Sequence, residues 1–274
     1  MAVKNIIPDL PFSIRKKMGL ALSEYRMILP GDRILIGLSG GKDSLVLALA
    51  LEGLRRRSPV RFSLSACTVD ITAGEMDTSP LVDFCASLDI PYFVKKHPIV
   101  NIINIRSERS PCSLCANIRR GILNSAAKEA DCNLLALGHN LDDAVETALM
   151  NIFHAGRFKA FQPKYRQSRS GITVIRPLVF TEERRIAKEA AGRDLPVLKY
   201  VCPFSLQTER VRAKKILDQL AAGNPRIKYN IVHALKSIDE GDRWECADVL
   251  EDSQPETAGT FARIEKLPES FRPT

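Results

Sequence analysis

The stretch RILIGLSGGKDSLVLALALEGL, residues 33–54, decides the fold. It begins with a short apolar run, which predicts a buried strand over Arg33–Leu38, and it ends with apolar residues at helical spacing. Between the two lies SGGKDS, whose adjacent glycines let main-chain N–H groups approach an anion, with a helix N-terminus behind them. The sequence therefore predicts a phosphate-binding loop made by Ser39, Gly40, Gly41, Lys42, Asp43 and Ser44.

This loop does not match the two commonest nucleotide-binding signatures. A Walker A loop needs Ser or Thr directly after its lysine, whereas Lys42 is followed by Asp43, and the spacing of a dinucleotide-binding fingerprint fails as well. The remaining alternative is a glycine-rich turn in which Asp43 and Ser44 are ordinary first-turn helix residues. The order of strand, loop and helix favours phosphate binding.

Short apolar runs alternate with helical patterns over the next hundred or so residues. Four of them predict further strands, at Phe62–Val69, Tyr92–Lys95, Asn133–Leu137 and Thr173–Ile175. Strands that alternate with helices in this way are typical of an α/β fold, here a Rossmann-like parallel five-stranded sheet with flanking helices. Ligands of such sheets bind at the carboxyl ends of the strands, so functional residues are expected there.

The predicted sheet is flanked by helical segments. An amphipathic N-terminal helix is predicted over Ser13–Met27, and a small C-terminal helical cap over Leu206–Ala222 and Pro225–Ile238. We therefore expect an N-terminal basic helix in residues 1–30, the nucleotide domain in 31–200, the helical region in 201–250 and a surface tail in 251–274.

Composition and charge restrict the class of protein. The chain has 274 residues, of which 45% are hydrophobic and 26% charged, and these values argue against global disorder or a fibrous repeat. It has no apolar run of the ~18 residues that cross a bilayer and no signal-peptide pattern at its start, so we expect a cytoplasmic protein without a membrane segment. A net charge of +8 favours a polyanionic partner, of which RNA is the first candidate.

Several polar residues follow the predicted strands. The segment Gly138-His139-Asn140-Leu141-Asp142-Asp143 comes after the fourth strand and opens a helix. Adjacent carboxylates in this position are either capping residues or groups that handle a bound cation. Asp70 ends the second strand, where aspartate is also a common turn residue, and Arg176 follows the fifth.

Two of the seven cysteines form a CxxC pair, Cys112 and Cys115. Such a pair alone is compatible with a zinc half-site, a redox pair or an iron–sulfur corner. Cys202 follows the fifth strand, so the loops after the third and fifth strands could bring three thiols to one sheet edge. The others, Cys67, Cys85, Cys132 and Cys246, receive no functional role.

The loop SGGKDS resembles the PP-loop of the N-type ATP pyrophosphatases, which split ATP into AMP and pyrophosphate while adenylating an oxygen. This resemblance implies that the loop holds ATP, that Asp70 borders the adenosine pocket and that Arg176 faces phosphate. Carboxylates beside phosphates imply Mg²⁺ between them. The segment GHNLDD resembles the tRNA-thiolating branch, which implies that Gly138 and His139 face ATP. The implied catalytic residues are Asp43, Asp142 and Asp143.

The run CSLCANIRRGIL resembles the TtcA-like tRNA 2-thiocytidine synthetases, and the likeness covers about residues 12–240. It implies a [4Fe-4S] cluster held by Cys112, Cys115 and Cys202, with one iron left open for sulfide. It also implies that ATP adenylates O2 of a tRNA cytidine before sulfur attacks C2 and AMP leaves. A sulfur donor such as a cysteine desulfurase and a homodimer are the further partners expected.

Two departures from the family pattern keep other functions open. Ser205 stands where a second CxxC would end, and Asn140 stands where the family has histidine, as in the related 2-thiouridine enzymes. The alternatives are thiolation of a tRNA uridine, and an ATP pyrophosphatase or amidotransferase that acts on a small molecule and carries structural zinc. A non-catalytic nucleotide sensor is a third, although it would need fewer carboxylates.

Residues 154–180 contain basic and aromatic side chains but no carboxylate. Interleaved residues of these types hold phosphates and stack unpaired bases, whereas the alternative is a solvated basic loop. The nucleic-acid contacts predicted here and beside the CxxC pair are Arg119, Arg120, Arg157, Lys159, Lys164 and Arg166.

Overall fold

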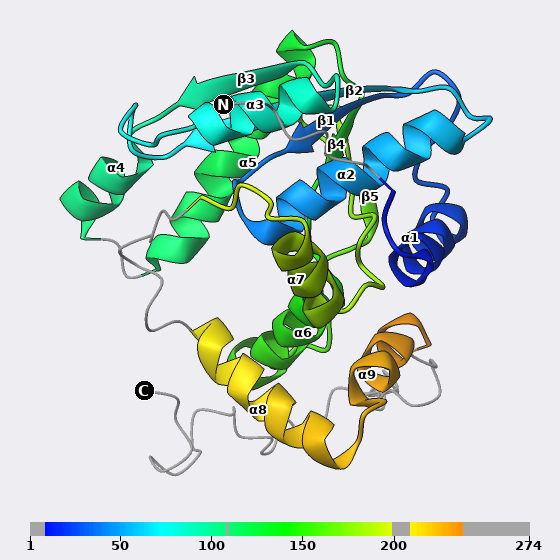
Figure 1. Ribbon diagram of the computed structural model, residues 1–274. Helices are drawn as coiled ribbons and strands as arrows, with labels where there is room; N and C mark the ends of the chain where they lie inside the picture. The colour runs from blue at the N-terminus through cyan, green and yellow to red at the C-terminus, as the bar shows by residue number, and fades with distance from the viewer. Residues whose placement is uncertain (1–8, 108–109, 199–208, 238–274) are drawn as a thin grey trace, which may run out of the picture. The chain divides into compact units, whose positions relative to one another are not determined.

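The computed structural model describes residues 9–107, 110–198 and 209–237 (Figure 1). By its internal contacts the chain divides into a compact unit, Met1–Ser237, and a second unit, Ile238–Thr274, which lies outside the described residues. Among the helices that the structure describes, none has the length and apolar character needed to cross a membrane.

The centre of the fold is a six-stranded sheet in the order β3-β2-β1-β4-β6-β5. Its strands are β1 Arg33–Gly37, β2 Ser63–Asp70, β3 Tyr92–Lys96, β4 Leu134–Ala136, β5 Lys164–Arg166 and β6 Thr173–Ile175. Five strands are parallel, as predicted, and β5 adds an antiparallel edge. The sequence analysis predicted no strand at β5, because a three-residue strand reading Lys-Tyr-Arg carries no apolar run.

Side chains of β1 alternate between the two faces of the sheet, as the period of a strand requires. Ile34 and Ile36 join one hydrophobic cluster, whereas Leu35 joins the other. The first cluster is covered by α1 (Phe12–Glu24), α2 (Lys42–Arg57), α3 (Ser79–Ser87) and α7 (Glu183–Gly192). The second is covered by α4 (Ile99–Arg106) and α5 (Pro111–Glu129).

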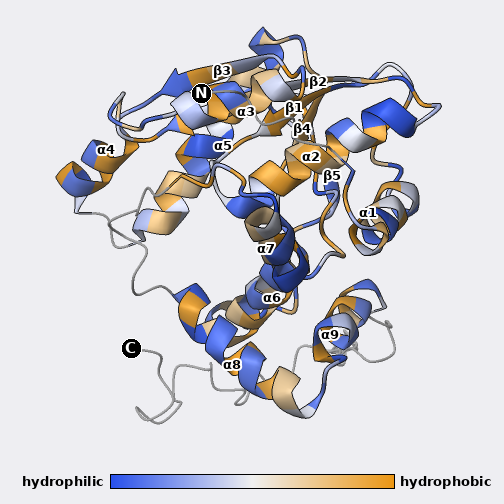
Figure 2. Cartoon of the chain, in the orientation of Figure 1, coloured by the Kyte–Doolittle hydropathy of each residue, from blue (hydrophilic) through white to orange (hydrophobic). Residues whose placement is uncertain are grey.

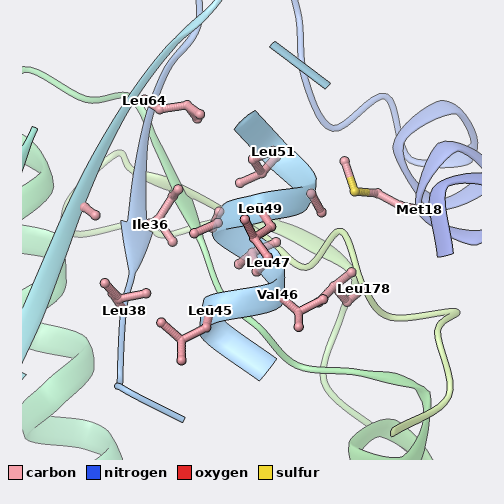
Figure 3. Packing of buried hydrophobic residues seen from close by; sticks show 14 of the residues in the cluster. Met18, Ile36, Leu38, Leu45, Val46, Leu47, Leu49, Leu51, Leu64 and Leu178 are labelled. Atoms are coloured by element: carbon pink, nitrogen blue, oxygen red, sulfur yellow. The ribbon is translucent and has the colours of Figure 1, made fainter. Parts of the chain in front are cut away.

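Helix α2 is buried on all sides over its central turns, from Ser44 to Gly53. Figure 3 shows its leucines between β1 and the residues Met18 and Leu178, which approach from outside the sheet. Truncation of one such leucine to alanine costs about 2–5 kcal/mol. This packing fixes the start of α2, and therefore the loop before it, relative to the sheet.

Three further elements gather at the carboxyl end of the sheet. Helix α6 (Leu141–Ala155) leaves β4 and contacts α8 (Glu209–Gly223) and α9 (Ile227–Lys236). A small cluster that includes Val145, Leu149, Ala213 and Leu217 holds α8 against α6. Figure 2 shows hydrophobic residues in the strands and along α2, whereas α7 is largely hydrophilic, and Lys214 of α8 pairs with Glu183 of α7 at 2.6 Å.

The helix ends differ slightly from the prediction. Helix α1 stops at Glu24 rather than Met27, because the chain reverses at Arg26, whose φ is 44°. Helix α8 begins at Glu209, and the predicted start at Leu206 lies outside the described residues.

Candidate active site

The loop between β1 and α2 is closed by its own side chains. Ser44 Oγ donates to the carbonyl oxygen of Gly41 (2.8 Å) and accepts from the main-chain N–H of Ser39 (3.1 Å). Gly41 is the N-cap of α2, and no side chain caps it. The first N–H groups of α2 are therefore available to an anion, which the helix dipole favours at this end.

Two glycines are required by close packing around this loop. Gly40 has φ +77°, and a Cβ there would lie 2.6 Å from Leu198 Cδ1. Gly138 lies against the opposite side of the loop, where a Cβ would meet main-chain atoms of Asp43 and Ser44 at 3.0 Å. Leu198 and the segment after β4 therefore both pack against the loop.

Lys42 and Asp43 at the start of α2 connect to α7. Lys42 Nζ lies 3.0 Å from Asp43 Oδ2 and 2.8 Å from Glu183 Oε1. Burial by itself lowers the pKa of Lys42, but the hydrogen bonds and charges of Glu183 and Asp43 raise it overall. Lys42 therefore carries a full positive charge beside the loop, where a phosphate group would be attracted to it.

The GHN segment is tied to the loop through Asn140. This residue caps α6 in a capping box: its side chain accepts from the N–H of Asp143 (3.1 Å), and Asp143 Oδ2 accepts from the N–H of Asn140 (2.9 Å). Asn140 Nδ2 also donates to Asp43 Oδ1 (3.0 Å). The two sequence signatures therefore form one hydrogen-bonded unit.

The carboxylates Asp142 and Asp143 have structural partners. Asp142 is buried, accepts from the N–H of Glu183 (2.7 Å) and pairs with Lys228 of α9. Asp143 pairs with Arg210 of α8 at 3.0 Å. Among the described residues no group of three potential ligands is gathered for a metal ion. These carboxylates do not form a prepared Mg²⁺ site in this arrangement, and Mg²⁺ stays a prediction.

Glu146 lies one turn further along α6 and is buried. Burial raises its pKa to about 7, although Arg210, 3.8 Å away, acts in the opposite direction. The nearby charge of Asp143 acts in the same direction as burial. Glu146 therefore exchanges a proton near neutral pH at the contact between α6 and α8.

Arg176 is buried and held by a set of contacts at the end of β6. Its Nε donates to His139 Nδ1 (3.2 Å), and an Nη group donates to the carbonyl oxygen of Gln162 (2.5 Å). The guanidinium lies 4.6 Å from the ring centroid of Phe161 and 5.3 Å from that of Tyr165. These contacts fix its plane, and no carboxylate neutralises it among the described ion pairs.

His139 is neutral in this setting. Burial lowers its pKa to about 3, and the charges of Arg176, Arg210 and Arg119 act in the same direction. Because Nδ1 accepts from Arg176, the hydrogen-bond pattern assigns the ring proton to Nε2. His139 can therefore donate a hydrogen bond from Nε2 without carrying a charge.

Asp70, at the end of β2, is buried and forms a turn with Thr72. Its Oδ1 accepts from the N–H of Thr72 (2.8 Å) and from its hydroxyl (2.6 Å). This turn leads to a pocket of about 530 Å³ whose walls include Met76, Pro80 and Leu198. Leu198 also donates its N–H to the carbonyl oxygen of Gly40 (2.9 Å), so this largely apolar pocket adjoins the loop.

The CxxC pair lies in the first turn of α5, whereas the sequence analysis expected it in a loop. Cys112 is exposed and Cys115 is half-buried, and a spacing of three residues puts both on one helix face. Because α5 ends where β4 begins, its N-terminus lies toward the carboxyl edge of the sheet. Cys202, the third predicted ligand, lies outside the described residues.

Three cysteines that received no role are buried in the core, namely Cys67, Cys85 and Cys132. Burial raises the pKa of Cys67 and Cys85 to about 12 and also raises that of Cys132. They are therefore protonated thiols, as their apolar neighbours predict. Only the thiols of Cys112 and Cys115 are accessible among the described residues.

The basic stretch after α6 is divided by the structure. Lys164 Nζ donates to the carbonyl oxygen of Arg26, just beyond the end of α1, and its contact with RNA stays a prediction. Tyr165 points into the second hydrophobic cluster, whereas Arg166 is exposed. The aromatic residue of this strand therefore packs inward.

The other predicted nucleic-acid residues lie on α5 and in the segment after α6. Arg157 and Lys159 are exposed in the segment after α6. Arg120 is exposed on α5 and donates to Asn117. Arg119, one turn after the CxxC pair, has a buried Nε that no described atom pairs with, a feature suited to an anionic ligand.

The sequence analysis missed four residues that organise the site. Asn140 couples the two motifs, Glu183 joins Lys42 to α7, and Arg210 and Lys228 pair with the helix α6 carboxylates. Asn140 was recognisable as an N-cap three residues before an acid. The other three are surface-type residues, and nothing in the local pattern distinguishes them.

Residues 14–197 match the family model described as PP-loop domain. A tRNA-cytidine(32) 2-sulfurtransferase from Geobacter sulfurreducens is 38% identical over 231 residues, 82% of this chain and 89% of the relative. One of the same name from Syntrophotalea carbinolica is 37% identical, over 85% of this chain and 92% of the relative.

A solved structure is also similar to this chain. It is the U34-tRNA thiolase NcsA from Methanococcus maripaludis with its [4Fe-4S] cluster, at 30% identity and a TM-score of 0.69. The match covers 86% of this chain and 80% of the thiolase.

Proposed function

Because the chain belongs to the PP-loop family and, within it, to the group of relatives named tRNA-cytidine(32) 2-sulfurtransferase, we propose that it thiolates a tRNA cytidine using ATP. The base oxygen O2 attacks the α-phosphate of ATP, and pyrophosphate leaves. Sulfide then attacks C2, and AMP leaves with the former O2 atom. AMP is a far better leaving group than oxide, which is why adenylation precedes sulfur transfer.

One observation carries this proposal, the convergence of the phosphate loop, the GHN segment and the CxxC helix. Asn140 connects the first two through its hydrogen bond to Asp43 (3.0 Å). The charge of Arg119, one turn after Cys115, adds to the burial and to the charges of Arg176 and Arg210 that lower the pKa of His139. A CxxC pair on the helix that carries Arg119 supports sulfur transfer over an amidotransferase acting on a small molecule, which would not need the thiols.

The described residues have distinct tasks in this reaction. The N–H groups at the start of α2 and the charge of Lys42 bind phosphates, and the pocket beside Leu198 offers apolar walls to the adenine ring. Arg176 keeps its charge next to the site, where it stabilises negative charge that develops on the transferred phosphate. His139 orients Arg176 and donates from Nε2 to an oxygen of the base or of ATP.

The thiol pair suits an iron–sulfur centre. Both thiols are accessible, share one helix face and lie at a helix N-terminus, whose dipole stabilises thiolates. By likeness to the archaeal thiolase, a [4Fe-4S] cluster bound by Cys112, Cys115 and Cys202 would supply the sulfide.

Thiolation of uridine is the second candidate. Asn140 and the 30% identity to a U34 thiolase favour it, whereas the 38% identity to a cytidine enzyme favours the main proposal. The O2 and C2 atoms react in the same way in both bases. The two candidates therefore differ only in base recognition.

Reconstituted thiolation tests the proposal. Anaerobically purified full-length protein is incubated with unmodified tRNA transcript, ATP and sulfide, and the digested tRNA is analysed by mass spectrometry. The expected product is 2-thiocytidine, with one AMP formed per thiolated base. 2-Thiouridine would support the second candidate, and AMP formation without any thionucleoside would refute both.

A further inference from the structure

A second pocket lies between α5 and the edge strand β5 with its hairpin, outside the site described above. It has a volume of about 590 Å³, within the range of ligand-binding pockets. Arg120 and Lys128 of α5 and Arg166 and Arg169 of the hairpin line it. No carboxylate lines it within the described part of the chain. Four cations gathered without an acid favour an anionic occupant.

The charges in this pocket are not used by the protein itself. Among the described residues, Lys128, Arg166 and Arg169 form no ion pair and no side-chain hydrogen bond, and Arg120 donates only to the amide of Asn117. Like charges that line one pocket repel one another. Their arrangement is stabilised when a polyanion enters.

An amide pair forms part of the same wall. Asn124, which is 8% exposed, donates from Nδ2 to Gln167 Oε1 (2.5 Å). The remaining atoms, Asn124 Oδ1 and Gln167 Nε2, are buried and have no partner among the described residues. Whichever way the two amides are oriented, one acceptor and one donor stay open. This is the complement of the neighbouring donor and acceptor on a nucleobase edge.

The pocket also adjoins the candidate active site. Tyr165 lines it, and the centroid of the Tyr165 ring lies 5.3 Å from the guanidinium of Arg176, whose Nε donates to His139. A strand of RNA whose target base lies at His139 therefore reaches this pocket with a neighbouring nucleotide. Double-stranded RNA would not expose the base edge that the amide pair requires.

We propose that this pocket binds one unpaired nucleotide next to the thiolated base of the tRNA, through phosphate contacts to Arg166 and Arg169 and base contacts to Asn124 and Gln167. Gln167 is half-buried, so a change of its side-chain rotamer presents the amide atoms to the base. The inference rests on the proposed function for the identity of the RNA. It adds a recognition site away from the reacting atoms.

The test measures binding of the full-length protein to unmodified tRNA transcript, and to transcripts made abasic at single positions on either side of the target base. Gln167→Ala should weaken binding of intact tRNA about tenfold, within the range for losing a base contact. At one abasic position the same substitution should have no further effect. Arg166→Ala with Arg169→Ala should make the log–log salt dependence shallower by roughly 1.4, or ~0.7 for each contact.

The matched control is Arg61→Ala, an exposed arginine in the segment before β2, away from the pocket. It should leave affinity and salt slope unchanged. Equal weakening by Gln167→Ala on intact RNA and on every abasic RNA would overturn base recognition, and an unchanged slope in the double variant would overturn phosphate binding. Thiolation by the unaltered protein is measured in parallel. If thiolation fails while Gln167→Ala loses its effect on one abasic RNA as expected, only the proposed function is refuted.

Discussion

The ion pairs of Glu183 provide the sharpest test of how the site is held together. This side chain, at the start of α7, receives Lys42 at 2.8 Å from the phosphate loop and Lys214 at 2.6 Å from α8. Burial by itself raises the pKa of Glu183, but the hydrogen bonds from Lys214 and Lys42 outweigh it and lower the pKa to about 2. Glu183→Gln removes the charge while keeping the shape.

The expected loss follows from that pKa. The difference between 4.5 and about 2 corresponds to about 3 kcal/mol, at 1.36 kcal/mol for each pH unit. The side chain is 24% exposed, and solvent screening reduces the value, so we expect Glu183→Gln to lower the free energy of unfolding by about 2 kcal/mol.

The pH dependence of the free energy of unfolding shows the direction of the contribution that the Glu183 charge makes. A carboxyl group whose pKa is depressed by folding stabilises the protein fully above its unfolded pKa, and this contribution is lost as the pH falls from about 4.5 toward 2. The difference between the two proteins should therefore be constant from pH 8 to 5 and shrink below pH 4.5. Glu182, whose pKa is also about 2, is present in both proteins, so its effect cancels.

Urea unfolding of the two proteins across this pH range is the assay. The control is Glu129→Gln, which removes an exposed partner of Lys95 and should cost less than about 1 kcal/mol. A loss for Glu183→Gln no larger than that of the control would refute the assigned role of Glu183. A difference that stays the same from pH 7 to pH 3 would refute its electrostatic origin.

Three further changes test the site. Gly138→Ala should cost about 1–3 kcal/mol in urea unfolding, because its Cβ would lie 3.0 Å from main-chain atoms of the loop; Gly19→Ala, with open space around it, is the control, and equal stabilities would contradict the packing. Asp43→Asn should reduce AMP formation far more than tRNA binding, since it removes charge beside the phosphates; equal losses would indicate a folding defect. Cys112→Ser should abolish the brown colour and the iron content of anaerobically purified protein, while Cys246→Ala should retain both; zinc alone in active unaltered protein would contradict a cluster.

The parallel sheet and the phosphate loop were predictable because they depend on local sequence. The apolar run before Ser39 and the helix after Ser44 specify strand, loop and helix within one short segment. The glycine at position 40 was predictable for the same reason, since its φ of +77° is a property of the turn itself. Burial of Cys67 and Cys85 followed from their apolar neighbours.

Contacts between distant segments were not predictable. Glu183 lies 141 residues from Lys42, and Lys228 lies 86 residues from Asp142. Each is an ordinary charged residue in its own helix, so only the fold brings the partners together. The same holds for β5, whose three residues form a strand because β6 offers an edge. The amide pair of the second pocket joins residues 43 positions apart.

The capping contacts of Asn140 and Asp143 were only partly predictable from the sequence. The sequence analysis treated the acids after Asn140 as either caps or cation-handling groups, and the structure gives Asp143 the cap contact. Local sequence identified both alternatives but not the ion pair of Asp143 with Arg210 of α8, and the catalytic role of Asp143 stays a prediction.

The nucleoside composition of tRNA from cells lacking this protein shows whether the protein thiolates cytidine. Tandem mass spectrometry of digested tRNA should show that 2-thiocytidine has disappeared while 2-thiouridine derivatives keep their normal level. Expression of the intact protein should restore 2-thiocytidine, and expression of the Asp43→Asn variant should not. Undiminished 2-thiocytidine in the deletion strain would contradict the account.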